Sequence, residues 1–114
     1  MKSDTGQDFQ DDPPALARRA IETFVREGTM IAPLLIIPPH SILNLKAGCF
    51  VCIKTAHDLR GCIGTIEPLK DTLAEEIIIN AVHAATRDPR FEPVSAEELP
   101  ELYYSVDVLD PPSP

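Results

Sequence analysis

Tryptophan is absent from this chain of 114 residues, and aromatic residues as a whole make up only 5% of it. We therefore expect a single aliphatic core of isoleucine, leucine, valine and alanine. No segment approaches the roughly 18 consecutive apolar residues of a membrane-spanning helix, and the opening residues, MKSDTGQDFQDD, lack the apolar region of a secretory signal. These absences predict a globular protein of the cytoplasm that has no membrane partner.

Positive charge is also scarce, because 10 lysine and arginine residues stand against 18 aspartate and glutamate residues, which gives a formal net charge of −8. Nucleic acids and anionic lipids attract proteins that carry positive surface fields. The charge balance thus argues against non-specific binding to either. Three cysteines, an odd number without a secretory signal, argue against a secreted disulfide scaffold and favour a reducing compartment.

Twelve prolines divide the chain into short elements. Residues 1–13 are polar and acidic, and we expect them to form a disordered tail ahead of a domain over residues 14–114. The spacing of apolar residues predicts an amphipathic helix over residues 15–27, which Gly28 ends. The next segment is apolar but interrupted by prolines, so we expect an extended stretch and then a short helical turn over residues 41–45.

A hairpin and a second helix come next. Residues 49–54 (CFVCIK) are apolar on both faces, which is typical of a central strand, and residues 59–66 form its predicted hairpin partner. A helix over residues 70–86 follows, in which Thr72 and Glu75 have the spacing of a capping box.

A capped turn over residues 95–99 leads to the clearest strand, residues 102–109. Its apolar side chains alternate with polar ones, so that Leu102, Tyr104 and Val106 share one face. The order of elements predicts an α+β fold, with a small antiparallel or mixed sheet flanked by helices.

The main candidate site lies in LRGCIG, at residues 59–64. Because side chains alternate along a strand, Leu59 and Ile63 are predicted to face the core, and Arg60 and Cys62 to share the other face. A cationic neighbour favours the thiolate, which is the reactive form of cysteine. Cys62 is therefore the candidate nucleophile.

Two glycines in the same strand extend this candidate site. Gly61 and Gly64 have no side chain, so another backbone or a ligand can approach the strand closely at these positions. The motif also has a purely structural interpretation. A cysteine in a sheet is often a small buried hydrophobe, glycines often mark bulges, and an arginine at a strand edge often lies in solvent.

LRGCIG, followed by TIEP, by NA at residues 80–81 and by RDPRF at residues 87–91, resembles the AMMECR family, which includes the AmmeMemoRadiSam system protein A of prokaryotes. The similarity runs from the helix at Ala15 through the GxFVxIK pattern at residues 48–54 to PVSAEELPELYYSVDVLDPP at residues 93–112. It implies an α+β fold and no established biochemical activity. It also implies partners, a Memo-like protein and a radical S-adenosylmethionine enzyme. We predict no cofactor.

Members of the family continue beyond the strand that corresponds to residues 102–109. The resemblance therefore leads us to expect that the C-terminal part of the domain is missing from this chain. An exposed sheet edge would then be covered by a partner chain, for example in a homodimer.

Basic and polar residues near the second helix complete the candidate ligand site. Arg60, Arg87 and Arg90 are predicted to form a pocket for a phosphate or carboxylate, with Asp88 either capping the turn or pairing with an arginine. Asn80 has apolar neighbours and needs hydrogen-bond partners, for which the loop bearing LRGCIG is the nearest candidate. A structural clamp between helix and hairpin explains Asn80 equally well.

Three further features have open interpretations. Glu67 is either a neighbour of a helix cap or a carboxylate of the ligand site. His83 is a second catalytic candidate, a general base for Cys62, although helical histidines often lie at the surface. Cys49 and Cys52 have a CxxC spacing, but residues three apart on a strand point to opposite faces, so a zinc site is not predicted.

Two functions follow from these residues. The first is an AMMECR-type component of a multi-protein system, which presents the face of Arg60 and Cys62 to a small anionic ligand or a partner protein. The alternative is a cysteine-dependent enzyme, in which His83 or Glu67 moves protons for the Cys62 thiolate. The sequence has no recognisable cysteine–histidine catalytic signature, which favours the binding component.

Overall fold

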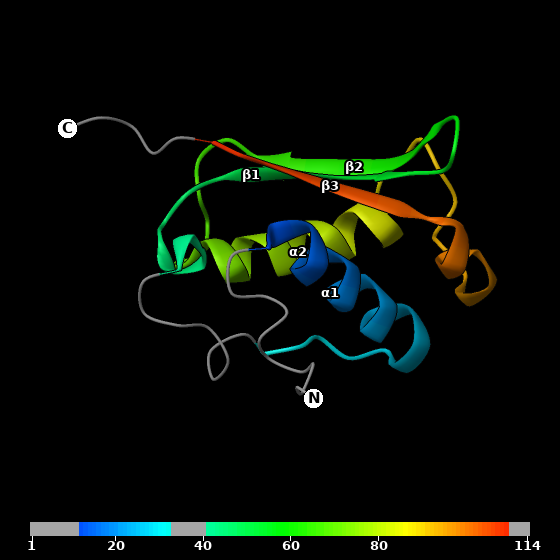
Figure 1. Cartoon of the computed structure of the whole chain (residues 1–114), viewed down its shortest axis with the longest axis horizontal. Helices are drawn as coiled ribbons and strands as arrows, with labels where there is room; N and C mark the ends of the chain where they lie inside the picture. The colour runs from blue at the N-terminus through cyan, green and yellow to red at the C-terminus, as the bar shows by residue number, and fades with distance from the viewer. Residues whose placement is uncertain (1–11, 33–40, 110–114) are drawn as a thin grey trace.

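A three-stranded antiparallel sheet and two α-helices make up the described part of this computed structural model, residues 12–32 and 41–109 (Figure 1). The strands are β1 (Cys49–Lys54), β2 (Leu59–Thr65) and β3 (Tyr103–Val108), and their order in the sheet is β2-β1-β3. The predicted α+β fold is confirmed, and β1 is the central strand, as its apolar sequence indicated.

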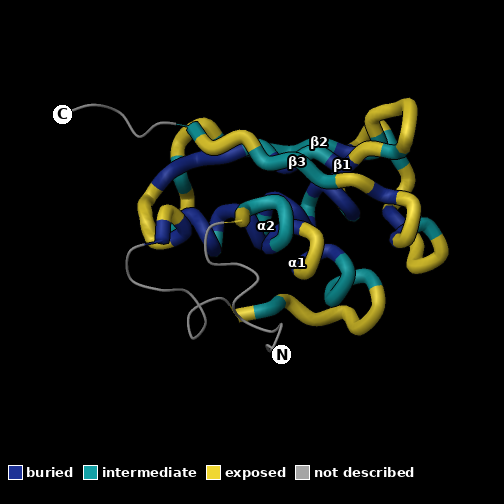
Figure 2. The backbone as a smooth tube through the Cα atoms, in the orientation of Figure 1, coloured by how far each residue is buried: buried dark blue, intermediate teal, exposed yellow. Residues whose placement is uncertain are grey.

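Both helices lie against the same face of the sheet (Figure 1). We call this the inner face. Its β1 side chains, Cys49, Val51 and Ile53, are completely buried in the core. In Figure 2 most of the second helix also has the colour of buried residues. Neither helix covers the opposite face. The strand alternation and register place the following residues on this outer face: Phe50, Cys52, Cys62, Gly64, Tyr103, Ser105 and Asp107.

The first helix, α1 (Pro13–Glu27), begins two residues before the predicted start and within the segment predicted to be a tail. The Asp12 carboxylate caps it by accepting a hydrogen bond from the N–H of Ala15, and a proline suits the first helical turn, where the backbone N–H has no partner. Gly28 ends the helix in the left-handed conformation, as predicted. The rest of the predicted tail, residues 1–11, lies outside the described residues.

The second helix, α2 (Leu73–Thr86), packs against β1, β2 and α1, while α1 packs against β3. Thr72 caps it, because its hydroxyl accepts a hydrogen bond from the N–H of Glu75 at 3.2 Å, which is one of the two bonds of the predicted capping box. The helix starts three residues later than the predicted 70–86. The backbone N–H groups just before the cap instead donate to a carboxylate further along the helix, described below.

Two 3-10 helices connect the main elements. The first, η3 (Ile42–Asn44), is the predicted turn after Ser41, whose hydroxyl accepts from the N–H of Leu43. Most of the extended stretch predicted before it, residues 33–40, lies outside the described residues. The second, η4 (Ala96–Glu101), is the predicted capped turn before β3. No helix within the described ranges is long and apolar enough to cross a membrane.

A β-bulge interrupts the hairpin at Arg60. The register pairs Ile53 with Gly61 but Lys54 with Leu59, so Arg60 has no partner on β1. The extra residue reverses the alternation on one side of the bulge. Leu59, predicted to face the core, is 38% exposed, and that prediction is wrong.

Candidate functional site

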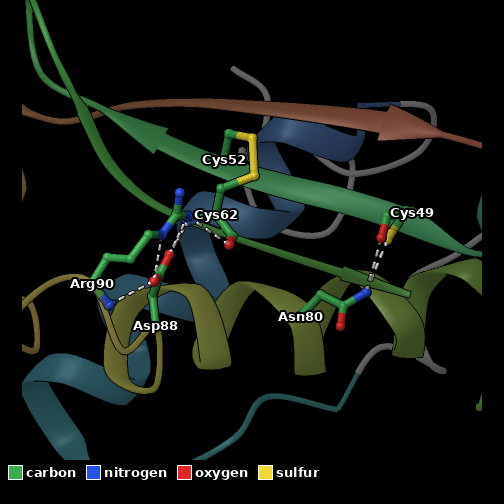
Figure 3. Close-up of a disulfide and its surroundings, with 6 residues drawn as sticks. All are labelled: Cys49, Cys52, Cys62, Asn80, Asp88 and Arg90. Carbon is green, nitrogen blue, oxygen red and sulfur yellow. Dashed lines mark hydrogen bonds and ion pairs between the residues drawn. A yellow bond between two sulfur atoms is a disulfide. The ribbon is translucent and has the colours of Figure 1, made fainter. Parts of the chain in front are cut away.

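Cys52 and Cys62 form a disulfide on the outer face (Figure 3). The two residues are direct partners in the β1–β2 register, and both are half-buried. Cys62 is therefore not a free thiol in this structure, so the predicted role as a nucleophile requires the reduced form of the pair. Cys49 lies on the inner face instead, as expected for a residue three positions before Cys52.

The bulge explains why the sequence did not reveal this pair. A regular hairpin with a turn over residues 55–58 places Cys52 opposite Gly61 and leaves Cys62 without a cysteine partner. One extra residue at Arg60 shifts the register by one position and brings the two cysteines together. Bulges have no reliable signature in a single sequence, although a glycine next to the bulge is a recurrent hint.

Arg60 points to the loop before β3, where its guanidinium forms a two-point ion pair with Glu98 at 2.7 and 3.0 Å and also donates to the Pro93 carbonyl at 3.4 Å. The hydrogen bonds from Arg60 lower the pKa of Glu98 to about 2. The predicted contact between Arg60 and a Cys62 thiolate does not form, because the bulge redirects the arginine. Glu98 was expected only in the capped turn, and its partnership with Arg60 was missed.

Asp88 is almost completely buried and holds the loop after α2 against the hairpin (Figure 3). Its carboxylate accepts two hydrogen bonds from the Arg90 guanidinium, at 2.7 and 3.0 Å, and one from the N–H of Cys62 at 3.0 Å. The pKa of Asp88 lies far below its usual range, mainly because of the hydrogen bonds from Arg90. The predicted pairing of Asp88 with an arginine is confirmed.

The same two side chains occupy the edge of the sheet. β2 is an edge strand, and the N–H and C=O groups of Cys62 point away from β1 towards Asp88 and towards Arg90, whose Nη2 is 3.5 Å from the carbonyl oxygen. Cys52 and Cys62 are consequently a pair without ladder hydrogen bonds between them, the type in which side chains lie closest. The loop also closes the centre of this edge to another strand.

A polar cluster lies at the other end of the hairpin, on the inner face. Asn80 donates hydrogen bonds to the Thr65 hydroxyl at 3.1 Å and to the Cys49 carbonyl at 3.2 Å, so it joins α2 to both strands of the hairpin. Neither partner lies within LRGCIG, since Thr65 follows the motif and Cys49 is on β1, so the contacts match the alternative of a structural clamp between helix and hairpin. Burial raises the pKa of the neighbouring Cys49 thiol to about 11.

Glu76 completes this cluster and was not anticipated. Its side chain is fully buried and accepts hydrogen bonds from the Thr65 hydroxyl and from the N–H groups of Leu69 and Lys70. These bonds hold the segment before α2 out of the helix. A sequence signal was available, because Glu76 and Asn80 are four residues apart in a helix that is otherwise largely apolar, which places both on one face.

Gly61 and Gly64 have separate packing roles. A side chain at Gly61 would collide with the backbone carbonyl of Ala84, so the glycine lets α2 approach β2 closely. This confirms the expected close approach of another backbone. Gly64 lies under the aromatic ring of Phe50 on the outer face, where a Cβ atom would meet the ring.

The remaining predicted site residues are dispersed. His83 is half-buried on α2, and burial, with a smaller contribution from Arg87, lowers its pKa. His83 lies on α2, which packs on the inner face, whereas the Cys62 sulfur is bonded to Cys52 on the outer face. Glu67 and Arg87 are exposed. The predicted three-arginine anion pocket is not assembled either, because Arg60 and Arg90 are each paired with a carboxylate.

Residues 14–114 match the AMMECR1 family. The chain belongs to the AMMECR1 family. The matched range includes both helices, apart from Pro13, and the whole sheet. The family resemblance carried by LRGCIG and RDPRF is therefore confirmed, and the structure shows that these two segments meet at Asp88, Arg90 and Cys62.

Individual AMMECR1 relatives agree with this assignment. A protein of Thermotoga maritima is 50% identical over 99 residues, which cover 86% of this chain and 56% of the relative. A protein of Clostridium acetobutylicum is 45% identical over 97 residues, or 85% of this chain and 21% of the relative. The crystal structure of an uncharacterised protein from Pyrococcus horikoshii matches 92% of this chain and 53% of its own, with a TM-score of 0.81 and 39% identity.

The chain thus spans about half the length, or less, of these AMMECR1 relatives. The regions of the AMMECR1 domain that it does contain are the two-helix layer, the hairpin with its disulfide, and the loop of Asp88 and Arg90 that fastens to the hairpin.

Proposed function

We propose that this AMMECR1 domain is a protein-binding component of an AmmeMemoRadiSam-like system, and that it binds its partner through the outer face of the sheet. The observation that carries the proposal is the one-sided cover of the sheet by α1 and α2 (Figure 1). The face that the helices leave uncovered presents Phe50, the Cys52–Cys62 pair and Tyr103, which is 62% exposed. Aromatic side chains of this kind are frequent centres of protein interfaces.

The comparison with the Clostridium relative supports a function in which this domain binds other proteins. The match occupies 21% of that protein, so the region equivalent to this chain is one part of a much longer polypeptide there. A domain that is linked covalently to other segments in one organism is a good candidate to bind separate partners in another. The family resemblance names those partners as a Memo-like protein and a radical S-adenosylmethionine enzyme.

The geometry favours a protein partner over a small anion. Arg60 and Arg90, two of the three arginines proposed for an anion pocket, already form ion pairs with Glu98 and Asp88. An anion would have to displace a carboxylate from each. The enzyme alternative needs a reduced Cys62 and a base within hydrogen-bond reach, whereas His83 lies behind the sheet. A binding surface needs neither.

The proposal is tested with purified components. The Memo-like and radical S-adenosylmethionine proteins of the source organism are titrated calorimetrically with the wild-type chain, with Tyr103→Asp, and with a matched control, Met30→Asp. Met30 is 45% exposed and follows α1, on the helical side of the molecule. We expect Tyr103→Asp to weaken binding of at least one partner by tenfold or more and Met30→Asp to leave it unchanged.

Two results would overturn the proposal. The first is no binding of either protein to the wild-type chain under conditions in which a full-length AMMECR1 relative binds its own partners. The second is an equal loss of affinity in Tyr103→Asp and Met30→Asp, since the partner would then not bind specifically through the outer face.

A further inference from the structure

We propose that Cys52 and Cys62 are a reversible redox site, which small thiols and disulfides of the glutathione type reduce and oxidise while the domain stays folded. This site goes beyond partner binding, because it assigns a chemical reaction to the outer face. It rests on the position of the two cysteines in the sheet, on their accessibility, and on the independence of the hairpin from the bond.

The backbone alone brings the two cysteines together. They are opposite each other in adjacent antiparallel strands, with their Cα atoms 4.1 Å apart. The backbone groups of Cys62 point outwards to Asp88 and Arg90, so the pair belongs to the class without ladder hydrogen bonds, in which side chains meet. The two sulfur atoms therefore remain neighbours whether or not a bond joins them.

Access distinguishes this pair from the third cysteine. Cys52 and Cys62 are half-buried on the face that neither helix covers, so a small thiol can reach them. Cys49 is 0% exposed on the inner face, where its sulfur accepts a hydrogen bond from Asn80. Because Cys49 points to the opposite side of β1, it cannot compete for either partner. Only one disulfide is available to the folded chain.

The hairpin does not depend on the disulfide. β1 pairs with both β2 and β3, and the Asp88 carboxylate holds the N–H of Cys62 from the other side. Gly61 keeps β2 in close contact with the backbone of α2. These contacts persist in the reduced protein, so reduction leaves the thiols in place for reoxidation. In a reducing compartment a disulfide of this type is expected to be transient rather than structural.

The reaction is ordinary thiol–disulfide exchange. The thiolate of one cysteine attacks a small disulfide, RSSR, which forms a mixed disulfide and releases RS⁻. The thiolate of the second cysteine then attacks the protein sulfur of the mixed disulfide, which closes the Cys52–Cys62 bond and releases a second RS⁻. The protein loses two electrons and two protons, and RSSR is reduced to two thiols. Two molecules of RSH reverse each step.

The test measures which cysteines are oxidised in the native chain. The protein is equilibrated anaerobically in buffers of graded reduced and oxidised glutathione, quenched with acid, alkylated after denaturation, and digested with trypsin. Cys49 and Cys52 fall in the peptide of residues 47–54, and Cys62 falls in that of residues 61–70. Fragmentation of the linked peptides identifies the bonded sulfurs. Cys52→Ser is analysed in parallel, and circular dichroism confirms that each sample is folded.

We expect the Cys52–Cys62 linkage to rise from a minor to the dominant species across the series and to revert fully when reduced glutathione is restored, with Cys49 alkylated throughout. In Cys52→Ser, Cys62 should retain glutathione as a mixed disulfide because no second thiol resolves it. The proposal is overturned if the two cysteines stay reduced in the most oxidising folded sample, if Cys49 takes part in the linkage, or if the bond forms only in unfolded protein. Failure here leaves the binding proposal intact, since Tyr103 tests that proposal independently of the cysteines.

Discussion

The Asp88 carboxylate accepts the backbone N–H of Cys62 at 3.0 Å, although 26 residues separate the two in the chain. This bond joins the loop after α2 to the edge strand of the sheet, and the Arg90 guanidinium neutralises the buried charge. The two sequence segments that carry the family resemblance are thus parts of one structural unit.

Asp88→Asn should destabilise the protein by about 2 kcal/mol at pH 7. The substitution removes the negative charge that pairs with Arg90, and it replaces one acceptor oxygen with an NH2 group that can only donate. The pKa of Asp88 is depressed on folding. Its stabilisation is therefore complete above the carboxyl pKa of the unfolded chain, about 3.9, and is lost as pH falls below that value. Urea unfolding at pH 7 and pH 3 should show a smaller acid sensitivity in the variant. Asp107→Asn, at an exposed β3 position, is the control and should behave as wild type.

The Arg60–Glu98 pair should contribute modestly, since both side chains are partly exposed. A double-mutant cycle with Arg60→Gln and Glu98→Gln should give a coupling free energy of about 1 kcal/mol at pH 7. The folded pKa of Glu98 is about 2. The coupling should thus be present above the unfolded glutamate pKa, about 4.3, and decline as pH falls towards 2. A coupling that does not change with pH would contradict the ion pair.

Glu76→Ala should cost about 3 kcal/mol, because it empties the site of a fully buried side chain and removes the acceptor of the Thr65 hydroxyl and of the N–H groups of Leu69 and Lys70. Chemical unfolding measures the loss, and hydrogen exchange locates it: the amides of Leu69 and Lys70 should exchange faster than in wild type. Glu75→Ala changes the adjacent, half-exposed residue and is the matched control. Unchanged exchange at Leu69 in Glu76→Ala would refute this role.

The two glycines of the motif should respond differently to alanine. In Gly64→Ala the new methyl group meets the Phe50 ring, which a second substitution can remove, so Phe50→Leu should recover most of a loss of about 1–3 kcal/mol. In Gly61→Ala the obstacle is the backbone of α2 at Ala84, and no side-chain change relieves it. Equal rescue of both variants by Phe50→Leu, measured by thermal unfolding, would contradict these contacts.

Reduction of the Cys52–Cys62 bond should lower the free energy of unfolding by about 2–3 kcal/mol, the value expected for cross-linking residues ten apart in the chain. Denaturant unfolding with and without dithiothreitol measures this difference. The Cys52→Ser variant should show no dependence on the reductant, and Cys49→Ala should keep the wild-type dependence.

Local patterns were sufficient to predict the elements of the fold. Apolar spacing, Thr72, Ser95 and Gly28 gave both helices and the capped turn to within a few residues, because caps and periodicity are set by neighbours in the chain. Asp12 was missed as the cap of α1, although it directly precedes two prolines that suit a helix start.

The candidate site was less predictable because it depends on register and on distant partners. Strand alternation alone predicted that Arg60 lies beside Cys62. The bulge at Arg60 changes the register, so that Arg60 pairs with Glu98 and Cys62 bonds to Cys52. The capping glutamate in SAEEL showed no sign of a second partner 38 residues away. Composition indicates which groups need a partner, but the partner itself follows from tertiary packing.

The side chains at the β2 edge also determine how this sheet can grow. Asp88 and Arg90 occupy the centre of that edge, so a strand added along β2 finds the backbone groups of Cys62 already engaged. An edge closed in this way resists the continuous strand stacking of fibres.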